Sequence, residues 1–144
     1  MENILKISEA ASLALHAVVY LADRTNEKLT NKDIAAAIKV SEAHLSKVMQ
    51  RLAKAGIVTS NRGPKGGFTL AKDPVETRLL DVYEAIEGPL PSGYCLIGSP
   101  VCGGDKCILG DLLRNLNNEV RFYLENTRLS DLTEVFGEEE QCIA

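Results

Sequence analysis

Apolar residues recur at helical spacing in five stretches of the chain, and residues typical of helix ends bound each stretch. Ser8 is placed to cap the first helix, and Thr30-Asn-Lys-Asp33 has the form of a capping box for the second. Gly56 follows the third, where a helix C-terminus favours positive φ. The pattern predicts a mainly α-helical protein with helices over residues 8–22, 30–38, 41–55, 77–88 and 108–126, and a short last helix over 130–136 that Ser130 caps.

The second and third predicted helices are separated by the dipeptide Lys39-Val40, and Ser41 is placed to cap the third. Two capped helices joined by so short a turn form the helix-turn-helix pattern. By itself this pattern is a weak signal, because many small helical domains contain it. Residues 23–29, which precede it, are predicted to form a polar turn.

Two short β-type runs follow the third helix, at residues 57–60 and 68–70. The segment between them is rich in glycine and carries Arg62 and Lys65. A basic hairpin in that place makes a winged helix, in which the helix enters the major groove and the wing lies on the DNA backbone. We therefore expect a mainly α winged helix-turn-helix domain with a small β wing over residues 1–88; a surface hairpin with solvated charges is the alternative.

The distribution of charge favours nucleic acid as a partner, although the net charge is −4. Residues 1–80 carry 12 Lys and Arg against 8 Asp and Glu, whereas residues 81–144 carry 4 against 12. From Ser41 to Lys72 there are six basic residues and one acidic residue, Glu42. A basic surface confined to one half of a protein is typical of DNA binding.

We expect side chains on the early turns of the third helix to reach base edges, and the wing glycines to let backbone amides approach phosphate. The free amides at the start of the second helix offer another phosphate site. Glu42 either accepts a hydrogen bond from cytosine or only favours the helix dipole. The predicted DNA contacts are Thr30, Asn31, Ser41, Glu42, His44, Lys47, Arg51, Arg62, Gly63, Lys65 and Gly66.

With 45% apolar and 25% charged residues the chain fits an ordinary soluble domain, and no apolar run reaches the roughly 18 residues of a membrane span. The N-terminus lacks the basic start and unbroken apolar centre of a signal peptide, because Glu2, Lys6 and Glu9 fall within it. We therefore expect a cytoplasmic protein with no membrane partner. In that compartment disulfides are disfavoured, and clustered cysteines indicate metal binding or redox chemistry.

Three of the four cysteines lie close together, at Cys95, Cys102 and Cys107. Glycines and prolines run through residues 89–107, so this segment is neither a helix nor a continuous strand. Thiolates select zinc, copper(I) or iron–sulfur centres, and a flexible loop lets several sulfurs converge on one point. We expect this cysteine-rich loop to bind such a centre.

The helix predicted over residues 108–126 carries an apolar stripe that is long for so small a protein. A second copy of the chain is the natural cover, which predicts a homodimer; packing back onto the first helix, as in a monomer, is the alternative. Residues 108–144 are thus assigned to a dimerisation helix and an acidic tail, and this tail contains Cys142.

An enzyme is not expected. The chain contains no P-loop, no dinucleotide-binding fingerprint, no G-x-S-x-G and no H-E-x-x-H motif. Its two histidines, His16 and His44, offer little for Cys–His catalysis.

Four segments carry a resemblance to a known family: ALHAVVYLA (14–22), LAKAGIVTSNRG (52–63), GGFTLA (66–71) and LLDVYEAIEG (79–88). Together with the order of the elements, they resemble the Rrf-type family of bacterial winged-helix regulators. The resemblance implies homodimers that bind palindromic promoter DNA, with the long helix as the dimer contact and an arginine such as Arg62 in the minor groove. In the cluster-binding branch, it implies that three loop cysteines hold a [2Fe–2S] or [4Fe–4S] cluster.

The fourth cluster ligand differs between branches of that family. The position of a ligating histidine in IscR-like members is Gly110 here, and that of an acidic ligand in NsrR-like members is Ser12. The position of a ligating histidine in RsrR-like members is His16, which matches. The resemblance thus implies His16 of the partner subunit as a ligand beside Cys95, Cys102 and Cys107. The alternatives are Cys142, Ser12 or solvent as that ligand, and a packing role for His16.

The predicted function is a homodimeric DNA-binding transcription regulator that senses redox state, nitric oxide or iron/cluster status through an iron–sulfur cluster. The same regulator with a zinc or thiol-oxidation switch is the alternative. A winged helix used only for protein contacts is a third hypothesis. Target promoters, the direction of regulation and cluster nuclearity stay open at this point.

Overall fold

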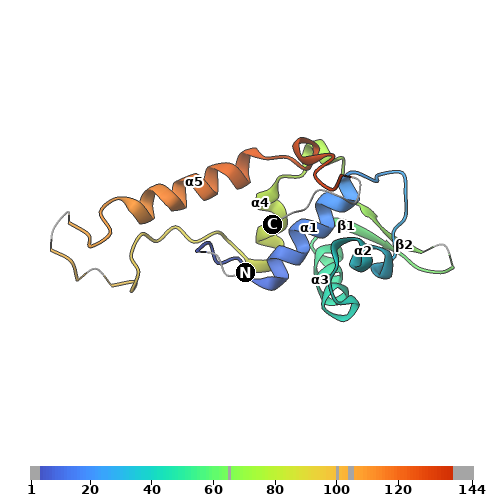
Figure 1. Ribbon diagram of the computed structural model, residues 1–144, viewed down its shortest axis with the longest axis horizontal. Coiled ribbons are helices and arrows are strands. Elements are labelled where there is room, and N and C mark those ends of the chain that lie inside the picture. The colour runs from blue at the N-terminus through green and yellow to red at the C-terminus, as the bar shows by residue number, and fades with distance from the viewer. Residues whose placement is uncertain (1–3, 65, 100, 104–105, 138–144) are drawn as a thin grey trace.

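The helix α1 (Glu9–Ala22) lies at the centre of the molecule and packs against α3 (Glu42–Lys54) and α4 (Leu79–Glu87) (Figure 1). Small side chains supply much of its buried surface, so both neighbouring helices approach it closely. The fully buried small residues of α1 are Ala11, Ala14, Ala17 and Val18. The computed structural model of the protein describes residues 4–64, 66–99, 101–103 and 106–137.

The remaining elements surround these three helices and extend from them. In chain order they are α2 (Asn31–Ile38), β1 (Val58–Asn61), β2 (Gly67–Leu70), the 3-10 helix η1 (Pro74–Glu76), α5 (Leu112–Asn126) and the 3-10 helix η2 (Leu129–Leu132). β1 and β2 pair antiparallel, with Val58 opposite Leu70. This architecture confirms the predicted winged helix-turn-helix fold class. No helix in the described part of the chain is long and apolar enough to cross a membrane.

Local side-chain caps start the first three helices where the sequence places them. The hydroxyls of Ser8, Thr30 and Ser41 each accept a hydrogen bond from the backbone amide three residues further on. The Asp33 carboxylate accepts from the Thr30 amide at 3.1 Å, which completes the capping box. Lys39, at φ 59°, ends α2 in the left-handed conformation and turns the chain directly into α3.

The projecting helix α5 begins at Leu112, so the predicted start near residue 108 is wrong. Residues 108–111 form a turn instead, and Gly110 adopts φ 58°. A left-handed glycine interrupts helical hydrogen bonding even though Ile108 and Leu109 continue the apolar period. Helical periodicity therefore extends past the true helix boundary here.

The prediction of a helix over residues 130–136 with Ser130 as its cap is also wrong. The chain there forms the single 3-10 turn η2. The Asp131 carboxylate accepts from the Arg128 amide at 2.8 Å, so this turn begins before Ser130. Glu134, at φ 71°, breaks helical geometry soon afterwards.

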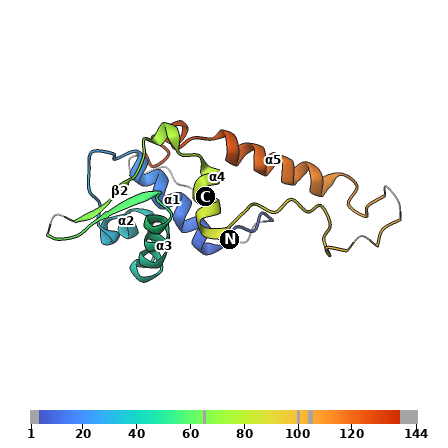
Figure 2. The same cartoon turned by 180° about the vertical axis from the view of Figure 1, so that it is seen from behind.

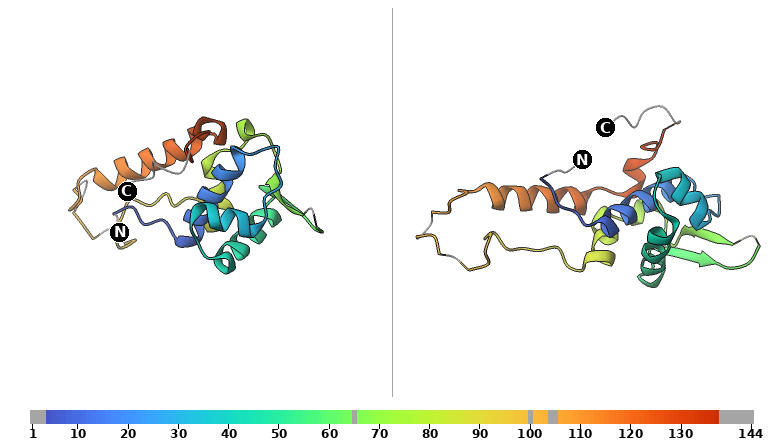
Figure 3. Two further views of the ribbon diagram at one scale, coloured as in Figure 1. Left: turned by 45° about the vertical axis from the view of Figure 1, so that its right-hand side comes forward. Right: turned by 60° about the horizontal axis from the view of Figure 1, so that its bottom comes forward.

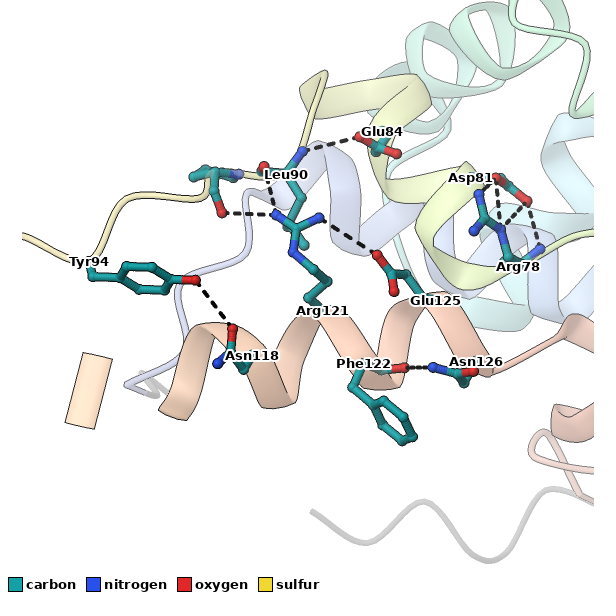
Figure 4. A network of polar contacts seen from close by, with 11 residues as sticks. Arg78, Asp81, Glu84, Leu90, Tyr94, Asn118, Arg121, Phe122, Glu125 and Asn126 are labelled. Atoms are coloured by element: carbon teal, nitrogen blue, oxygen red, sulfur yellow. Dashed lines mark hydrogen bonds and ion pairs between the residues drawn. The ribbon is translucent and has the colours of Figure 1, made fainter. Parts of the chain in front are cut away.

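The cap that begins α4 resembles the Arg128–Asp131 cap of η2, and a backbone hydrogen bond next to it ties α4 to the end of α5. The Asp81 carboxylate accepts from the Arg78 amide at 2.9 Å and from the Arg78 guanidinium at 2.8 Å (Figure 4). Leu79 donates from its amide to the carbonyl of Thr127 at 3.0 Å. Burial raises the pKa of Asp81, but the Arg78 hydrogen bonds and charge outweigh it and hold that pKa below its usual range.

We expect Asp81→Asn to lower the free energy of unfolding at pH 7 by about 1 kcal/mol, the usual cost of losing a helix cap. Because the folded-state pKa of Asp81 is depressed, its contribution is complete above the unfolded value of about 3.9. It is lost as the pH falls through the lower folded-state pKa. Urea unfolding at several pH values should show the difference between the two proteins shrinking in acid.

The matched control is Asp111→Asn, because Asp111 precedes α5 without a side-chain capping bond. We expect this variant to stay close to the wild type at every pH. An Asp81→Asn deficit of the same size at all pH values would contradict the assigned role of the carboxylate.

Candidate DNA-binding surface and cysteine loop

Asn31 bridges the two helices of the helix-turn-helix. Its side-chain amide donates to the carbonyl of Glu42, the first residue of α3, at 2.8 Å. The Asn31 Oδ1 atom is buried and has no hydrogen-bond partner among the described residues. The Thr30 hydroxyl accepts a hydrogen bond from the Asp33 amide at 3.1 Å. Asn31 therefore joins α2 to α3 and Thr30 caps α2, while their phosphate role stays a prediction.

The helix α3 presents a polar face away from the core. Leu45, Val48, Met49 and Leu52 are its buried residues. On the opposite side the side chains of Glu42, His44 and Lys47 are exposed, and Ser41 caps the helix. His44 Nδ1 lies 3.6 Å from the Glu9 carboxylate at the start of α1.

Arg51 lies in the last turn of α3 and has a partner inside the molecule. Its guanidinium donates to the backbone carbonyl of Ile86, in the last turn of α4. The sequence analysis placed this cation, like Lys47, among the predicted DNA contacts. The sequence does not reveal this hydrogen bond to α4, because its acceptor is a backbone atom 35 positions away.

The wing contains a backbone partner that sequence reasoning missed. Leu29, predicted to lie in a polar turn, is only 9% exposed and pairs antiparallel with Phe68 of β2. The Phe68 amide donates to the Leu29 carbonyl at 2.7 Å, and the Leu29 amide donates back at 3.2 Å. A side chain at Gly67 would lie 2.8 Å from the Leu29 carbonyl oxygen. The absence of a side chain at Gly67 therefore lets the backbone at Leu29 pack against β2.

The wing strands β1 and β2 project from the body (Figure 3). The Gly66 amide donates to the Gly63 carbonyl at 2.8 Å, and a Cβ at Gly66 would lie 2.4 Å from the Asn61 carbonyl oxygen. Arg62 and Gly63 are exposed there. Lys65, also predicted to bind DNA, lies outside the described residues.

The cysteine loop and the wing lie at opposite ends of the molecule (Figures 1 and 2). Cys95, Cys102 and Cys107 are exposed free thiols. Cys107 Sγ accepts a hydrogen bond from the Leu109 amide at 3.4 Å. Within the described ranges, no three His, Cys, Asp or Glu side chains gather into a metal-sized group. The fourth cysteine, Cys142, lies outside these ranges.

His16 is exposed on α1, a helix that lies apart from the cysteine loop of the same chain (Figure 1). Its Nδ1 atom lies 2.6 Å from the carbonyl oxygen of Ser12, so Nδ1–H donates to that oxygen. In the neutral ring this leaves the lone pair on Nε2. The ring also meets Phe136 edge-on, with the centroids 6.3 Å apart.

The root of the cysteine loop is fixed by residues that sequence reasoning did not single out. The Glu84 carboxylate of α4 accepts from the Leu90 amide at 3.1 Å. Arg121 of α5 donates to the carbonyls of Leu90 at 3.2 Å and Pro91 at 3.3 Å (Figure 4). Charged residues on helix surfaces are usually solvated, so no sequence signal distinguishes these two.

Beyond the point where it packs on α4, α5 is largely uncovered in the single chain. Leu124 is its buried residue, whereas Leu112 is 52% and Phe122 is 69% exposed. Leu116 and Tyr123 are also exposed. The alternative in which this helix packs along α1 is not what the described residues show, because its neighbour is α4.

Comparison with known proteins identifies the family. A family model described as "Rrf2: Iron-dependent Transcriptional regulator" matches residues 7–135. The chain belongs to the Rrf2 family. A regulator from Aquifex aeolicus, described as a putative HTH-type transcriptional regulator, is 30% identical over 131 residues, which are 89% of this chain and 91% of that protein. The HTH-type transcriptional regulator IscR of Escherichia coli is 33% identical over 69% of this chain and 62% of its own.

Solved structures of this Rrf2 protein's relatives share its fold. CymR, titled the global cysteine regulator of Bacillus subtilis, superposes with a TM-score of 0.76 at 27% identity, over 92% of this chain and 98% of its own. An oxidized form of Staphylococcus aureus CymR gives 0.71 at 27% identity, over 90% and 97%. The named relatives are transcription regulators rather than enzymes, as expected from the sequence.

We expect Gly67→Ala to lower the free energy of unfolding by about 1–3 kcal/mol, because the new methyl group would overpack against the Leu29 backbone. Gly103→Ala is the control, since a Cβ there meets nothing within 4 Å. We expect that variant to stay within about 0.5 kcal/mol of the wild type. Urea unfolding measures both, and equal stability of the two variants would mean that the Leu29–Phe68 pairing does not depend on the glycine.

Proposed function

We propose that this Rrf2-family protein is a homodimeric regulator that binds promoter DNA and senses redox state, nitric oxide or iron/cluster status through an iron–sulfur cluster on its cysteine loop. The observation that carries this proposal is the set of three exposed, unpaired thiols, Cys95, Cys102 and Cys107, on one loop of a winged-helix protein. In a structural disulfide or a packed core these thiols would be consumed or buried.

The DNA-binding surface consists of the first turns of α3 together with the wing. Glu42, His44 and Lys47 are exposed where a recognition helix meets base edges. Arg62 is exposed at the base of the wing tip, where the guanidinium can follow a narrow minor groove. The N-terminus of α2 adds backbone amides, and Thr30 marks that end.

A second copy of the chain covers the exposed side of α5. The side chains of Leu112, Leu116 and Tyr123 fall on one helical stripe and are all exposed in the single chain. A contiguous apolar stripe of this kind is rarely left in water. Pairing of two such helices also places two recognition helices in one assembly, as a palindromic site requires.

The donor set fits an iron–sulfur cluster in its chemistry. Three thiolates are the ligands that such clusters prefer, and the Leu109 amide places a hydrogen-bond donor beside the Cys107 sulfur. In the described chain the three sulfurs are not gathered, so binding requires the loop to close. As the family resemblance implies, His16 of the partner subunit would supply the fourth ligand, and it would do so through Nε2 because Nδ1 is engaged by the Ser12 carbonyl. A bound cluster would supply a charge and redox state that the signal alters.

A thiol-oxidation switch is the second candidate function. Its support is the similarity to CymR, of which one solved structure is titled an oxidized form. Exposed thiols on a glycine-rich loop are also accessible to oxidants. In this candidate the winged helix and the dimer are unchanged, and only the chemistry at the loop differs.

We expect Arg62→Ala to weaken binding to a duplex that the wild-type protein selects from a random-sequence library. If each wing neutralises one phosphate, the slope of log affinity against log salt should fall by about 0.9 per protomer. Lys106→Ala, which removes a cation from the distant loop, is the control and should leave the slope unchanged. Titrations of metal-free protein at four salt concentrations measure the slopes, and an unchanged slope for Arg62→Ala would remove this residue from the DNA surface.

We expect wild-type protein purified without oxygen to be coloured and to contain iron and sulfide in equal amounts. Cys102→Ala should lose both, because two thiols and one imidazole cannot hold the cluster, and its affinity for the selected duplex should no longer respond to the signal. Absorption spectra with iron and sulfide counts measure the first point, and the counts per chain separate two irons from four.

Two further variants sharpen that experiment. Cys142→Ala should retain the cluster if His16 is the fourth ligand, whereas His16→Ala should alter its spectrum. A colourless wild type after attempted reconstitution would reject the cluster and leave the thiol switch. Signal-responsive binding by Cys102→Ala would argue against sensing through this loop altogether.

A further inference from the structure

The last turn of α4 is the place where the DNA-reading half of the molecule meets the root of the cysteine loop. Helix carbonyls in a last turn have no partner within the helix and need a donor from elsewhere. The Ile86 carbonyl of α4 is such a group, and the Arg51 guanidinium of α3 donates to it. A cation at a helix C-terminus is also favoured by the helix dipole.

The same turn of α4 fixes where the loop begins. Gly88 ends the helix at φ 79°, and its amide donates to the Glu84 carbonyl at 2.9 Å. The Glu84 carboxylate then accepts from the Leu90 amide at 3.1 Å. Arg121 closes the joint from α5 through the Leu90 and Pro91 carbonyls (Figure 4). The loop root and α3 are therefore both hydrogen-bonded to this one turn of α4.

The position of Arg51 on α3 agrees with a role in this joint. It lies nine residues beyond Glu42, or about 13 Å along the helix axis at 1.5 Å per residue. Recognition helices contact bases chiefly through their N-terminal residues. Arg51 is exposed, and its hydrogen-bond partner lies on α4, which packs against α3.

We propose that Arg51 is a positioning residue that couples the recognition helix to the root of the cysteine loop through the last turn of α4, rather than a DNA contact. Glu84 is its counterpart on the loop side. This inference rests on the proposed function, because that function supplies the signal that reaches the loop. By linkage, the coupling acts in both directions: the state of the loop alters DNA affinity, and DNA binding alters the loop root.

The first test uses Arg51→Met, with Lys54→Met as the matched control. Both variants remove one cation from the last turn of α3, and Lys54 has no hydrogen bond to α4 among the described residues. For the wild type we expect affinity for the selected duplex to differ at least about fivefold between metal-free protein and protein reconstituted with iron and sulfide, a typical allosteric coupling. Lys54→Met should keep this ratio, and Arg51→Met should bring it close to one.

The salt dependence of the same titrations separates the two roles of Arg51. A positioning residue leaves the slope of log affinity against log salt as it is in the wild type. A phosphate contact lowers the slope by about 0.9 per protomer. A lowered slope together with an intact affinity ratio in Arg51→Met would overturn the proposal.

Two further measurements do not need the signal. Hydrogen exchange of the Gly88 and Leu90 amides in metal-free protein should change when the duplex binds, and this change should disappear in Arg51→Met. In urea unfolding, the midpoint shifts of Arg51→Met and Glu84→Ala should not add in the double variant, because both act on one turn. Glu84→Gln, which keeps an acceptor for Leu90, should restore the wild-type behaviour.

These readouts distinguish the two possible failures. If the wild type selects no duplex, or shows no difference between its two loop states, the proposed function fails, and the double-variant cycle alone decides the inference. Additive midpoint shifts would then overturn it. If the wild type responds and Arg51→Met responds equally, the function stands and the coupling through Arg51 is rejected.

Discussion

The close packing of α3 and α4 on α1 is the constraint on which the rest of the molecule depends. Three alanines of α1 are completely buried, so the helices that flank it approach with little side-chain volume between them. With Val18 and Leu21 also buried, this core runs from Ala11 to Leu21, nearly three turns of the helix. Because α3 turns its apolar residues toward α1, its polar face is left outside for DNA. The direction of the recognition helix is thus a consequence of the core.

Most of the winged-helix body could be predicted from the sequence because its signals are local. Caps at Ser8, Thr30 and Ser41 and the apolar period of each helix act within a few residues, and they determine where α1, α2 and α3 begin. The start of α5 was misplaced because periodicity continues through Ile108 and Leu109 while the backbone at Gly110 does not. A single residue in the left-handed region outweighs two that fit the period.

Two of the contacts that sequence reasoning missed depend on partners far away in the chain. Leu29 pairs with Phe68 through backbone atoms, and Arg51 donates to a backbone carbonyl, so neither partner has a side chain that indicates the contact. The three cysteines were identified by residue type and spacing. Their convergence cannot be predicted in the same way, because the chain alone keeps them apart and the fourth ligand belongs to another copy in our proposal.

The separation of the wing from the cysteine loop also bears on how such regulators diversify. The loop leaves the body after α4, returns at α5, and is anchored at its root by Glu84 and Arg121. Its interior can therefore be rewritten by mutation without disturbing the core or the DNA-reading surface. A loop of altered sequence that keeps the Glu84 and Arg121 contacts would stay anchored to the same winged-helix body. In this arrangement the chemistry of the loop can change while the winged-helix body is kept.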